Sequence, residues 1–507
     1  MLRYIFRRLG ISVLVLFGAA TLVFVLTINS GDPLADLRET SADNRDELIE
    51  ARIRTMGLDK PWYERYAEWL RGAVGCVVPG MQCDLGVTNQ GQDVLALTES
   101  AMSATLRLVI GATVLAIIVG VAVGILSAVR KYSGFDYVIT FGAFIFFSLP
   151  VFWAAVLLKE YGAIRFNDWI ADPRMSVTQM IIIALITGLV LQFALGGDPR
   201  RRLLTAGAAF AVVLAALAYF DADNWFRDPS MGLGVVILVS AGAGVLVTSL
   251  VTGFSERRVL YAALTTVGAG AVITFALQDV LEDGGYALLA GLFVLTVAVS
   301  VAIGAAWGGH MRRQAMLVAW VTGVIMSVVV VMDYAVSHWS AMLELKPRPV
   351  LTIGALSPNF EGDFWERFLD TGTQLLLPTV LLTLISVASY SRYTRSSMLE
   401  VMEQDYIRTA RAKGVSERAV ITKHAFRNAL IPLTTIVAFD FASLISGAVV
   451  TEQVFGWRGM GQMFINGLRA VDPMPVMSFV LVTGAAAVLM NLAADIMYGY
   501  LDPRIRR

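Results

Sequence analysis

The sequence predicts an all-α polytopic membrane protein with about twelve transmembrane helices. Three observations lead to this prediction. The 507 residues are 57% hydrophobic and 16% charged, with a mean hydropathy of +0.67, which is too apolar for a water-soluble protein of this size. The chain contains apolar runs long enough to cross a hydrocarbon core of about 30 Å as helices. The loops between these runs alternate between basic and acidic, as expected if every second loop is cytoplasmic.

The first apolar run, residues 9–28, follows Arg3, Arg7 and Arg8. It is longer than the apolar centre of a signal peptide and lacks a small-residue cleavage site, so we expect a retained span with a cytoplasmic N-terminus. Eleven further runs are long enough to span: residues 105–129, 136–158, 177–195, 203–220, 232–252, 259–277, 286–306, 315–335, 374–391, 433–450 and 476–497.

The loops test this count of spans, because one missed or invented helix would invert every later loop. The loops expected inside the cell carry Arg130-Lys131, Arg200-Arg201-Arg202, Arg257-Arg258, Arg312-Arg313, the segment 392–432 and the tail Arg504-Ile505-Arg506-Arg507. The loops expected outside are acidic, with Asp221, Asp223, Asp279, Glu282 and Asp283. The distribution of Lys and Arg therefore supports twelve spans with both termini in the cytoplasm.

Residues 29–104 form a comparatively polar segment that we expect outside the membrane. Trp62, Tyr63, Tyr66 and Trp69 follow Pro61 at helical spacing. A helix lying at the outer membrane interface and the packing of a small extracytoplasmic cap both explain these aromatic residues. Only two cysteines exist, Cys76 and Cys83, whose spacing does not match a zinc motif; a disulfide and two free thiols both remain open.

The cytoplasmic segment 403–418 predicts two helices joined at a glycine. Residues 405–413 should form a short helix containing the small residues Ala410 and Ala412, with Gly414 as its C-terminal cap. Ser416 can cap a second helix that runs toward Asn428. A helix-glycine-helix elbow exposed to the cytosol has the shape of a docking element.

These residues resemble a known family, the permease subunits of binding-protein-dependent ABC importers in the dipeptide, oligopeptide and nickel branch. In that family the loop holds the coupling helix, with the pattern Glu-Ala-Ala-x-x-x-Gly, and here Arg408 stands where the pattern has Glu. The contact made by that Glu is therefore not carried over. Other segments are similar to the family in the same order: Gly57-Leu58-Asp59-Lys60-Pro61, His424 to Pro432, Glu452 to Gly461 and Leu501-Asp502-Pro503-Arg504.

The resemblance implies a multi-pass bacterial cell membrane protein that forms half of a translocation pathway for di- or oligopeptides. It also implies a second homologous permease subunit, two ATP-binding-cassette ATPase subunits or domains and an extracytoplasmic solute-binding protein as partners, besides membrane lipid. The loop residues that would couple to the ATPase are Asp405, Arg408, Thr409, Ala410, Arg411, Ala412, Lys413, Gly414 and Ser416. Since the chain has no Gly-Lys dipeptide, it lacks a phosphate-binding P-loop; we expect no enzymatic activity and no bound cofactor, with ATP and Mg²⁺ held by the partner ATPases.

A six-span importer subunit would pass directly from its third span to its fourth, but this chain has additional spans there. We therefore divide it into a cytoplasmic N-terminus with the first span (1–28), an extracytoplasmic segment (29–104), core spans 2 and 3 (105–158), an inserted block of six spans (159–373) and core spans 4 to 6 (374–507), which contain the coupling loop 392–432. The inserted block is nearly free of charges within its spans, which favours a scaffold or partner-binding module over a second translocation path.

Asp440 lies in the middle of a span, where it can line the substrate pathway or make a structural contact with a neighbouring helix. We expect Asp495, and the isolated His310, His338 and His424, to be interfacial residues; no metal site is expected.

Nickel or another small solute remains an alternative substrate. A twelve-span secondary transporter would need two related halves and ion-coupling charges, and a membrane enzyme would need clustered catalytic groups; the sequence has neither. The balance of 40 basic and 40 acidic residues does not indicate a nucleic-acid partner.

Overall fold

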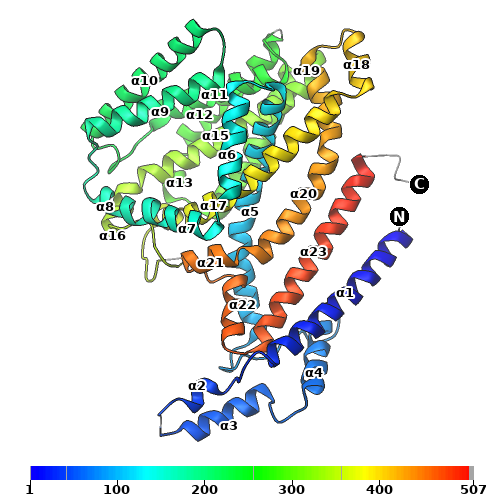
Figure 1. The fold of residues 1–507 in the computed structure, drawn as a ribbon. Coiled ribbons are helices and arrows are strands. Elements are labelled where there is room, and N and C mark those ends of the chain that lie inside the picture. Colours follow the sequence, from blue (N-terminus) through cyan, green and yellow to red (C-terminus); the bar gives the residue numbers. More distant parts are fainter. Residues whose placement is uncertain (1, 42, 255, 355–356, 502–507) are drawn as a thin grey trace.

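The computed structural model describes residues 2–501 except 42, 255, 355 and 356, and these residues form helices without any β-strand (Figure 1). Within the described chain, ten helices are long and apolar enough to cross a membrane, and two bent helix pairs raise the number of spans to at most twelve. The prediction of an all-α polytopic protein is confirmed. The expected basic tail, Arg504 to Arg507, lies outside the described residues.

The core consists of the helices that the sequence assigned to the six-span part. Its long helices are α1 (Leu2–Ile28), α5 (Val94–Val129), α6 (Gly134–Ser148), α17 (Phe364–Met402), α20 (Phe426–Gly447) and α23 (Pro473–Leu501). α5 and α17 form the most extensive helix pair. Gly120 and Gly124 of α5 make this close approach possible, because an added Cβ would lie 2.7 Å from the Cβ of Tyr390 and 2.6 Å from the Cβ of Thr394. Two small residues four positions apart are a common device for packing membrane helices.

The apolar run at residues 136–158, expected as one span, is broken at Pro150 in the structure. α6 ends at Ser148, and α7 (Val151–Lys159) starts a second segment that continues through a π-helical turn, η1 (Glu160–Ile164), into α8 (Arg165–Ala171). The two segments meet at an angle of 99°. Proline removes a backbone donor and disfavours helical geometry at the residue before it, and Leu149 is extended here, with ψ of 123°.

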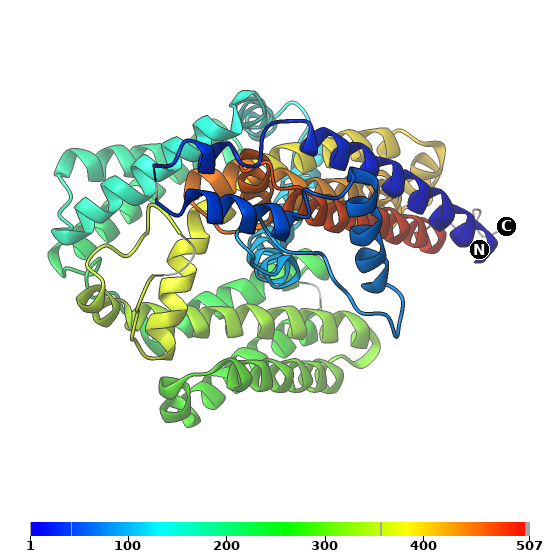
Figure 2. The ribbon, with the colours of Figure 1, turned by 90° about the horizontal axis from the view of Figure 1, so that it is seen from below.

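The inserted block contains the expected six apolar helices. They are α9 (Val177–Leu195), α10 (Pro199–Ala222), α11 (Gly232–Val251), α12 (Arg257–Ala276), α14 (Tyr286–Trp307) and α15 (Arg312–Ser337), accompanied by the short α13 (Gln278–Asp283), η2 (Gly309–Met311) and α16 (Trp339–Leu345). α9 pairs with α10, whereas α11, α12 and α14 all contact α15 and form a four-helix group. Figure 2 shows this group as a layer beside the core, apart from the α9–α10 hairpin.

The segment before α5 folds into α2 (Ala35–Arg38), α3 (Arg45–Met56) and α4 (Trp62–Gly75), at the far end of α1 from the N-terminus (Figure 1). Pro61 directly precedes α4. Tyr66 and Trp69 are buried in a cluster with Phe24 of α1, so for these two residues the packing explanation is correct. Trp62 remains 45% exposed and has no place in that cluster.

Cys76 and Cys83 are joined by a disulfide, which resolves the alternative that the sequence left open. The loop between them folds back on the end of α4. Gly72 and Gly75 permit this contact, since a Cβ at these positions would meet the carbonyl oxygens of Asp84 and Gln82 at 1.9 and 2.1 Å. We call this side of the bundle the disulfide end.

The opposite side of the bundle carries the predicted elbow and both ends of the described chain (Figure 1). There α17 is followed by α18 (Asp405–Ala412), α19 (Glu417–Ala419) and the π-helical turn η3 (Val420–Ala425), which continues into α20. We call it the elbow end, and residues 404–417 the elbow. At the disulfide end α20 is followed by α21 (Val449–Phe455) and α22 (Met460–Arg469), which lead to α23.

Candidate functional site

The elbow has the local structure that its sequence predicts. α18 covers Asp405–Ala412, and Gly414 follows it with φ of +74°, a conformation that favours glycine. The turn is closed by backbone hydrogen bonds, from Gly414 N to Arg411 O at 2.9 Å and from Val415 N to Ala410 O at 3.2 Å. The expected side-chain cap by Ser416 is wrong: α19 begins after this exposed residue, but its side chain makes no capping hydrogen bond.

One face of α18 is buried and the other is exposed. Ile407 and Ala410 pack into a cluster with Ala128 of α5, Met398 of α17 and Val420, Ala425 and Ala429 of the following helix. The other coupling residues proposed from the sequence are exposed, namely Asp405, Arg408, Thr409, Arg411, Ala412, Lys413, Gly414 and Ser416. Of the two small residues in the motif, Ala412 therefore lies on the outer face, whereas Ala410 is needed for packing within the chain.

Charges on the exposed face are partly paired within the elbow. Arg411 donates to both carboxylate oxygens of Glu417, at 3.0 and 2.6 Å, and this lowers the pKa of the Glu417 carboxyl below its ordinary value. Arg408 makes a longer ion pair with Asp405, at 3.4 Å. Lys413 forms no ion pair among the described residues, so it leaves a net positive charge near the tip of the elbow.

The elbow is connected to the spans by helical structure and by side-chain contacts. The Asn428 side chain donates a hydrogen bond to the Tyr406 hydroxyl at 2.9 Å, which joins α18 to the first turn of α20. Further along α20, the Asp440 carboxylate accepts hydrogen bonds from Ser386 and Tyr390 of α17, at 2.9 and 2.6 Å. Asp440 is half-buried, so the structure gives it a contact with a neighbouring helix while part of its surface stays accessible.

A second link between helices at the elbow end was not predicted from the sequence. Asp136 of α6 accepts two hydrogen bonds from the guanidinium of Arg395 on α17, at 2.7 and 2.8 Å, and a third from the Ser127 hydroxyl on α5. The Asp136 side chain is 4% exposed. The position of Asp136 next to the basic loop after α5 could have indicated an ion pair. Its partner could not be identified from the sequence, because Arg395 is far away in the chain.

The disulfide end of the core contains a polar cavity of about 530 Å³, which we call the vestibule. About half of its lining is apolar, and its polar residues carry amide or hydroxyl groups apart from two charged ones; they are Thr88, Asn89, Gln90, Gln92, Ser100, Arg458, Gln462, Asn466 and Asp472. Arg458 is exposed and belongs to the segment Glu452 to Gly461. Neutral amide side chains, the Arg458 cation and one buried carboxylate line this cavity. It is therefore suited to a polar ligand that both donates and accepts hydrogen bonds.

Buried carboxylates hold the wall of the vestibule in place. Glu452 is fully buried, accepts hydrogen bonds from Thr105 Oγ1 and Gln462 N at 2.7 and 2.9 Å, and has a pKa raised by its burial. Asp472 is 2% exposed and accepts from Asn89 N at 2.7 Å, and burial raises its pKa as well. These bonds connect α5 and the loop before it to α21, α22 and the turn that precedes α23.

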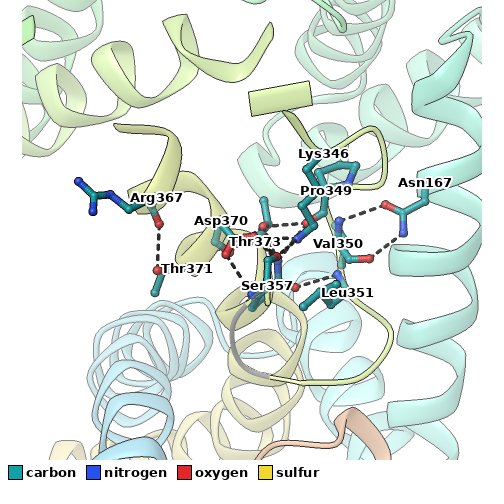
Figure 3. Close-up of polar contacts among 11 residues, drawn as sticks. Asn167, Lys346, Pro349, Val350, Leu351, Ser357, Arg367, Asp370, Thr371 and Thr373 are labelled. Carbon is teal, nitrogen blue, oxygen red and sulfur yellow. Dashed lines mark hydrogen bonds and ion pairs between the residues drawn. The ribbon is translucent and has the colours of Figure 1, made fainter. Parts of the chain in front are cut away.

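The loop from α16 to α17 attaches the inserted block to the core through a buried polar network (Figure 3). Lys346 Nζ contacts the Asp370 carboxylate at 2.7 Å, and the Ser357 hydroxyl donates to the same carboxylate at 2.5 Å. Asn167 of α8 exchanges two hydrogen bonds with the backbone of Val350. Beyond the close-up, Gly354 N donates to Phe455 O at 2.9 Å, so this loop also reaches α21.

Asp495 and the three histidines lie at contacts between helices or within a helix. Arg8 of α1 and Asp495 of α23 form an ion pair, in agreement with an interfacial role for Asp495. His310 Nε2 lies 3.5 Å from Glu256, and His338 Nε2 lies 3.8 Å from Glu282. The backbone carbonyl of His424 accepts a hydrogen bond from Asn428.

Comparison with known proteins identifies one family. The family described as "Binding-protein-dependent transport system inner membrane component" matches residues 286–507. A di/tripeptide transport system permease protein of Pseudomonas aeruginosa is 33% identical over 245 residues, which cover 46% of this chain and 70% of that protein.

Other relatives match over shorter lengths. An oligopeptide transport system permease protein of Mycobacterium tuberculosis is 43% identical over 153 residues, 30% of this chain and 47% of that protein. A dipeptide transport system permease protein of Escherichia coli is 43% identical over 140 residues, 28% of this chain and 41% of that protein. The chain thus spans about half the length of these two relatives, or less.

Proposed function

The chain belongs to the family of binding-protein-dependent transport system inner membrane components, and from this we propose that it is the permease subunit of an ATP-driven importer of di- or oligopeptides. It would form half of the translocation pathway, beside a second homologous permease subunit. The observation that carries this proposal is the elbow, which exposes the coupling residues on one face and anchors them to three spans on the other.

Coupling to ATP hydrolysis follows from how the elbow is attached. Ile407 and Ala410 fix α18 against the ends of α5 and α17 and against the helix that becomes α20. A displacement of α18 by two ATPase subunits would therefore be transmitted to these spans, because packed helices move as rigid bodies rather than deforming. In this proposal ATP and Mg²⁺ are bound by the partner ATPases, and this chain contributes the lever and the pathway.

Peptide as the substrate class is supported by the vestibule and by the relatives. A peptide offers backbone amides and a terminal carboxylate, which match the amide side chains and the Arg458 guanidinium that line the 530 Å³ cavity. The relatives from Pseudomonas, Mycobacterium and Escherichia are described as permeases for di/tripeptides, oligopeptides and dipeptides. An extracytoplasmic binding protein would deliver the peptide to this end. Asp440 lies farther toward the elbow end than the vestibule does, and it is our candidate for binding the ammonium group of the peptide.

The orientation in the bacterial cell membrane that we propose follows the charges. Lys and Arg gather in the loops at the elbow end, whereas acidic residues outnumber basic ones in residues 29–93 and in the loops after α10 and α12. This distribution is typical of a cytoplasmic elbow end, with both termini inside. The disulfide then lies outside the cytoplasm, where such bonds persist.

For the inserted block we propose a scaffold rather than a second pathway. A cavity of about 410 Å³ between α12, α14 and α15 is lined by residues without a single ionisable side chain. The block meets the core through α6 with α9, and through α17 with α15 and α16. Replacing residues 172–345 by a short linker tests this: retained uptake supports a scaffold that transport does not require, and correct assembly without uptake would support a pathway role.

The decisive experiment is uptake by the assembled transporter. The chain is expressed with its genomic neighbours in a peptide-transport-deficient bacterium, and uptake of a labelled dipeptide and of labelled nickel is compared. We expect ATP-dependent uptake of the dipeptide, reduced by Arg458→Gln. Nickel uptake with no peptide uptake would establish the alternative substrate class.

A further inference from the structure

A groove lies between α6 and α17 on the side of the Asp136–Arg395 ion pair, and neither the elbow nor the vestibule includes it. The cavity measures about 310 Å³ and is lined by these two helices and by Ser127 of α5. Along α17 it extends from Ala388 to Leu399. At a rise of about 1.5 Å per residue this stretch is about 16 Å long, which is half the thickness of a hydrocarbon core.

The two arginines that line this groove are in different electrostatic situations. Arg395 is neutralised by its two hydrogen bonds to Asp136. Arg392 is exposed, and no carboxylate oxygen of the described residues lies within ion-pair distance of it. Its guanidinium lies 4.6 Å from the centre of the Phe147 ring and 5.4 Å from that of Tyr393. The groove therefore carries one unneutralised cation, held against aromatic rings.

The rest of the groove is apolar and open to the surroundings of the bundle. Phe144 and Phe147 of α6 line it and are 56% and 61% exposed. Thr140 and Ser396 add hydroxyl groups to the lining, and Leu399 marks the end nearest the elbow. A ligand that fits this surface has an anionic, hydrogen-bonding head and an apolar part that can lie along phenylalanine rings.

We propose that this groove binds an anionic phospholipid from the membrane leaflet at the elbow end. The lipid phosphate contacts the Arg392 guanidinium and the Ser396 hydroxyl, and an acyl chain lies along Phe144 and Phe147. Two features favour a lipid over a protein segment: Arg392 has no carboxylate partner among the described residues, and the phenylalanine rings beside it are exposed along a membrane helix. Basic pockets between membrane helices at the cytoplasmic surface suit anionic headgroups, which are concentrated in that leaflet.

Lipid retention by the purified full chain in nanodiscs tests the headgroup. Nanodiscs contain phosphatidylglycerol and phosphatidylcholine in equal amounts, and tightly bound lipid is counted by native mass spectrometry. We expect a preference for phosphatidylglycerol. Arg392→Gln should lower this preference about fivefold, which is the effect of losing one cation that attracts anionic lipid at a membrane surface. Arg257→Gln, which removes an exposed arginine at the elbow end of α12, should leave it unchanged. Equal retention of both lipids, or equal loss in both variants, would overturn the proposal, and so would full competition by inorganic phosphate.

A second measurement does not depend on the stability of the arginine variant. Both native cysteines are in the disulfide, so Phe144→Cys introduces the only free thiol and accepts a bimane label. Phosphatidylglycerol brominated on its acyl chains should quench this label more strongly than brominated phosphatidylcholine. No quenching, together with a cross-link from this cysteine to another protein chain of the assembled complex, would show that a protein covers the groove and would overturn the lipid assignment.

Discussion

The carboxylate of Asp136 on α6 and the guanidinium of Arg395 on α17 form a two-bond ion pair, with N–O distances of 2.7 and 2.8 Å. It fixes the start of the broken third span against the helix that leads to the elbow. Because Asp136 is almost fully buried, removing it leaves a cation and the Ser127 hydroxyl without their acceptor.

We expect Asp136→Ala to lower the free energy of unfolding by about 3 kcal/mol, since breaking one side of a buried pair leaves the other charge uncompensated. Thermal unfolding in detergent measures the change. The exposed pair Arg165–Glu160 is the control, and Glu160→Ala should change stability by at most about 0.5 kcal/mol. If the double variant Asp136→Ala/Arg395→Ala is as unstable as the sum of the single variants, the two residues are not coupled.

Gly414→Pro should abolish uptake while binding-protein docking and ATP hydrolysis continue. Gly414 has φ of +74° and donates its N–H to Arg411 O, and proline can do neither. Gly414→Ala should be milder, because space around it is open and only the backbone conformation costs about 1–2 kcal/mol. Uptake and ATPase rate are measured on reconstituted complexes. Gly372→Ala, at an exposed helical glycine with open space, serves as the control; normal uptake by Gly414→Pro would contradict the lever.

Ala410 and Ala412 should respond differently to a bulky side chain. Ala410 is 8% exposed and packed inside the elbow, so Ala410→Phe should displace α18 and cost about 1–3 kcal/mol through overpacking. Ala412 is exposed, so Ala412→Phe should leave the fold intact and weaken only association with the ATPase. Hydrogen exchange of residues 404–417 and co-purification of the ATPase distinguish the two. Rapid exchange in both variants would show that the outer face also packs against this chain.

Asp440→Asn should reduce uptake of peptides with a free amino group and spare N-acetylated peptides. Asparagine keeps an oxygen that can accept from Ser386 and Tyr390, so the helix contact is retained and only the charge is lost. Uptake kinetics for the two peptide classes measure the effect. Tyr390→Phe removes one helix contact without changing charge and should affect both classes equally. Unchanged kinetics for Asp440→Asn would assign the carboxylate to structure alone.

The net contribution of Asp472 to folding stability should fall as pH rises. Burial raises the folded-state pKa of this carboxyl above its ordinary value of 3.8, so the folded state binds the proton more tightly than the unfolded state. Its contribution is therefore most favourable below the ordinary pKa and declines until pH passes the raised pKa. The free energy of unfolding, measured by denaturation in detergent between about pH 4 and 7, should fall along this range and become less dependent on pH in Asp472→Asn. A wild-type profile identical to that of the variant would contradict this account.

The sequence by itself determined the helices, the alternating basic and acidic loops and the local shape of the elbow. These depend on neighbours in the chain: a run of apolar residues must satisfy its own backbone in a membrane, and Gly414 ends α18 through its own φ angle. The inserted six helices were also predictable for this reason. The side-chain cap expected from Ser416 failed because the turn is closed by backbone bonds instead.

Only the tertiary structure decided which side chains meet. The pairing of Asp136 with Arg395, the burial of Glu452 beside Thr105 and the contact of Gly120 with Tyr390 each join residues more than two hundred positions apart. Apolar periodicity is almost absent in membrane helices, because lipid and neighbouring helices are both apolar, so it does not reveal which face is packed. The same reason hid the groove at Arg392. The burial of Ala410 depends instead on contacts with α5 and α17, and the break at Pro150 lies within a continuous apolar run.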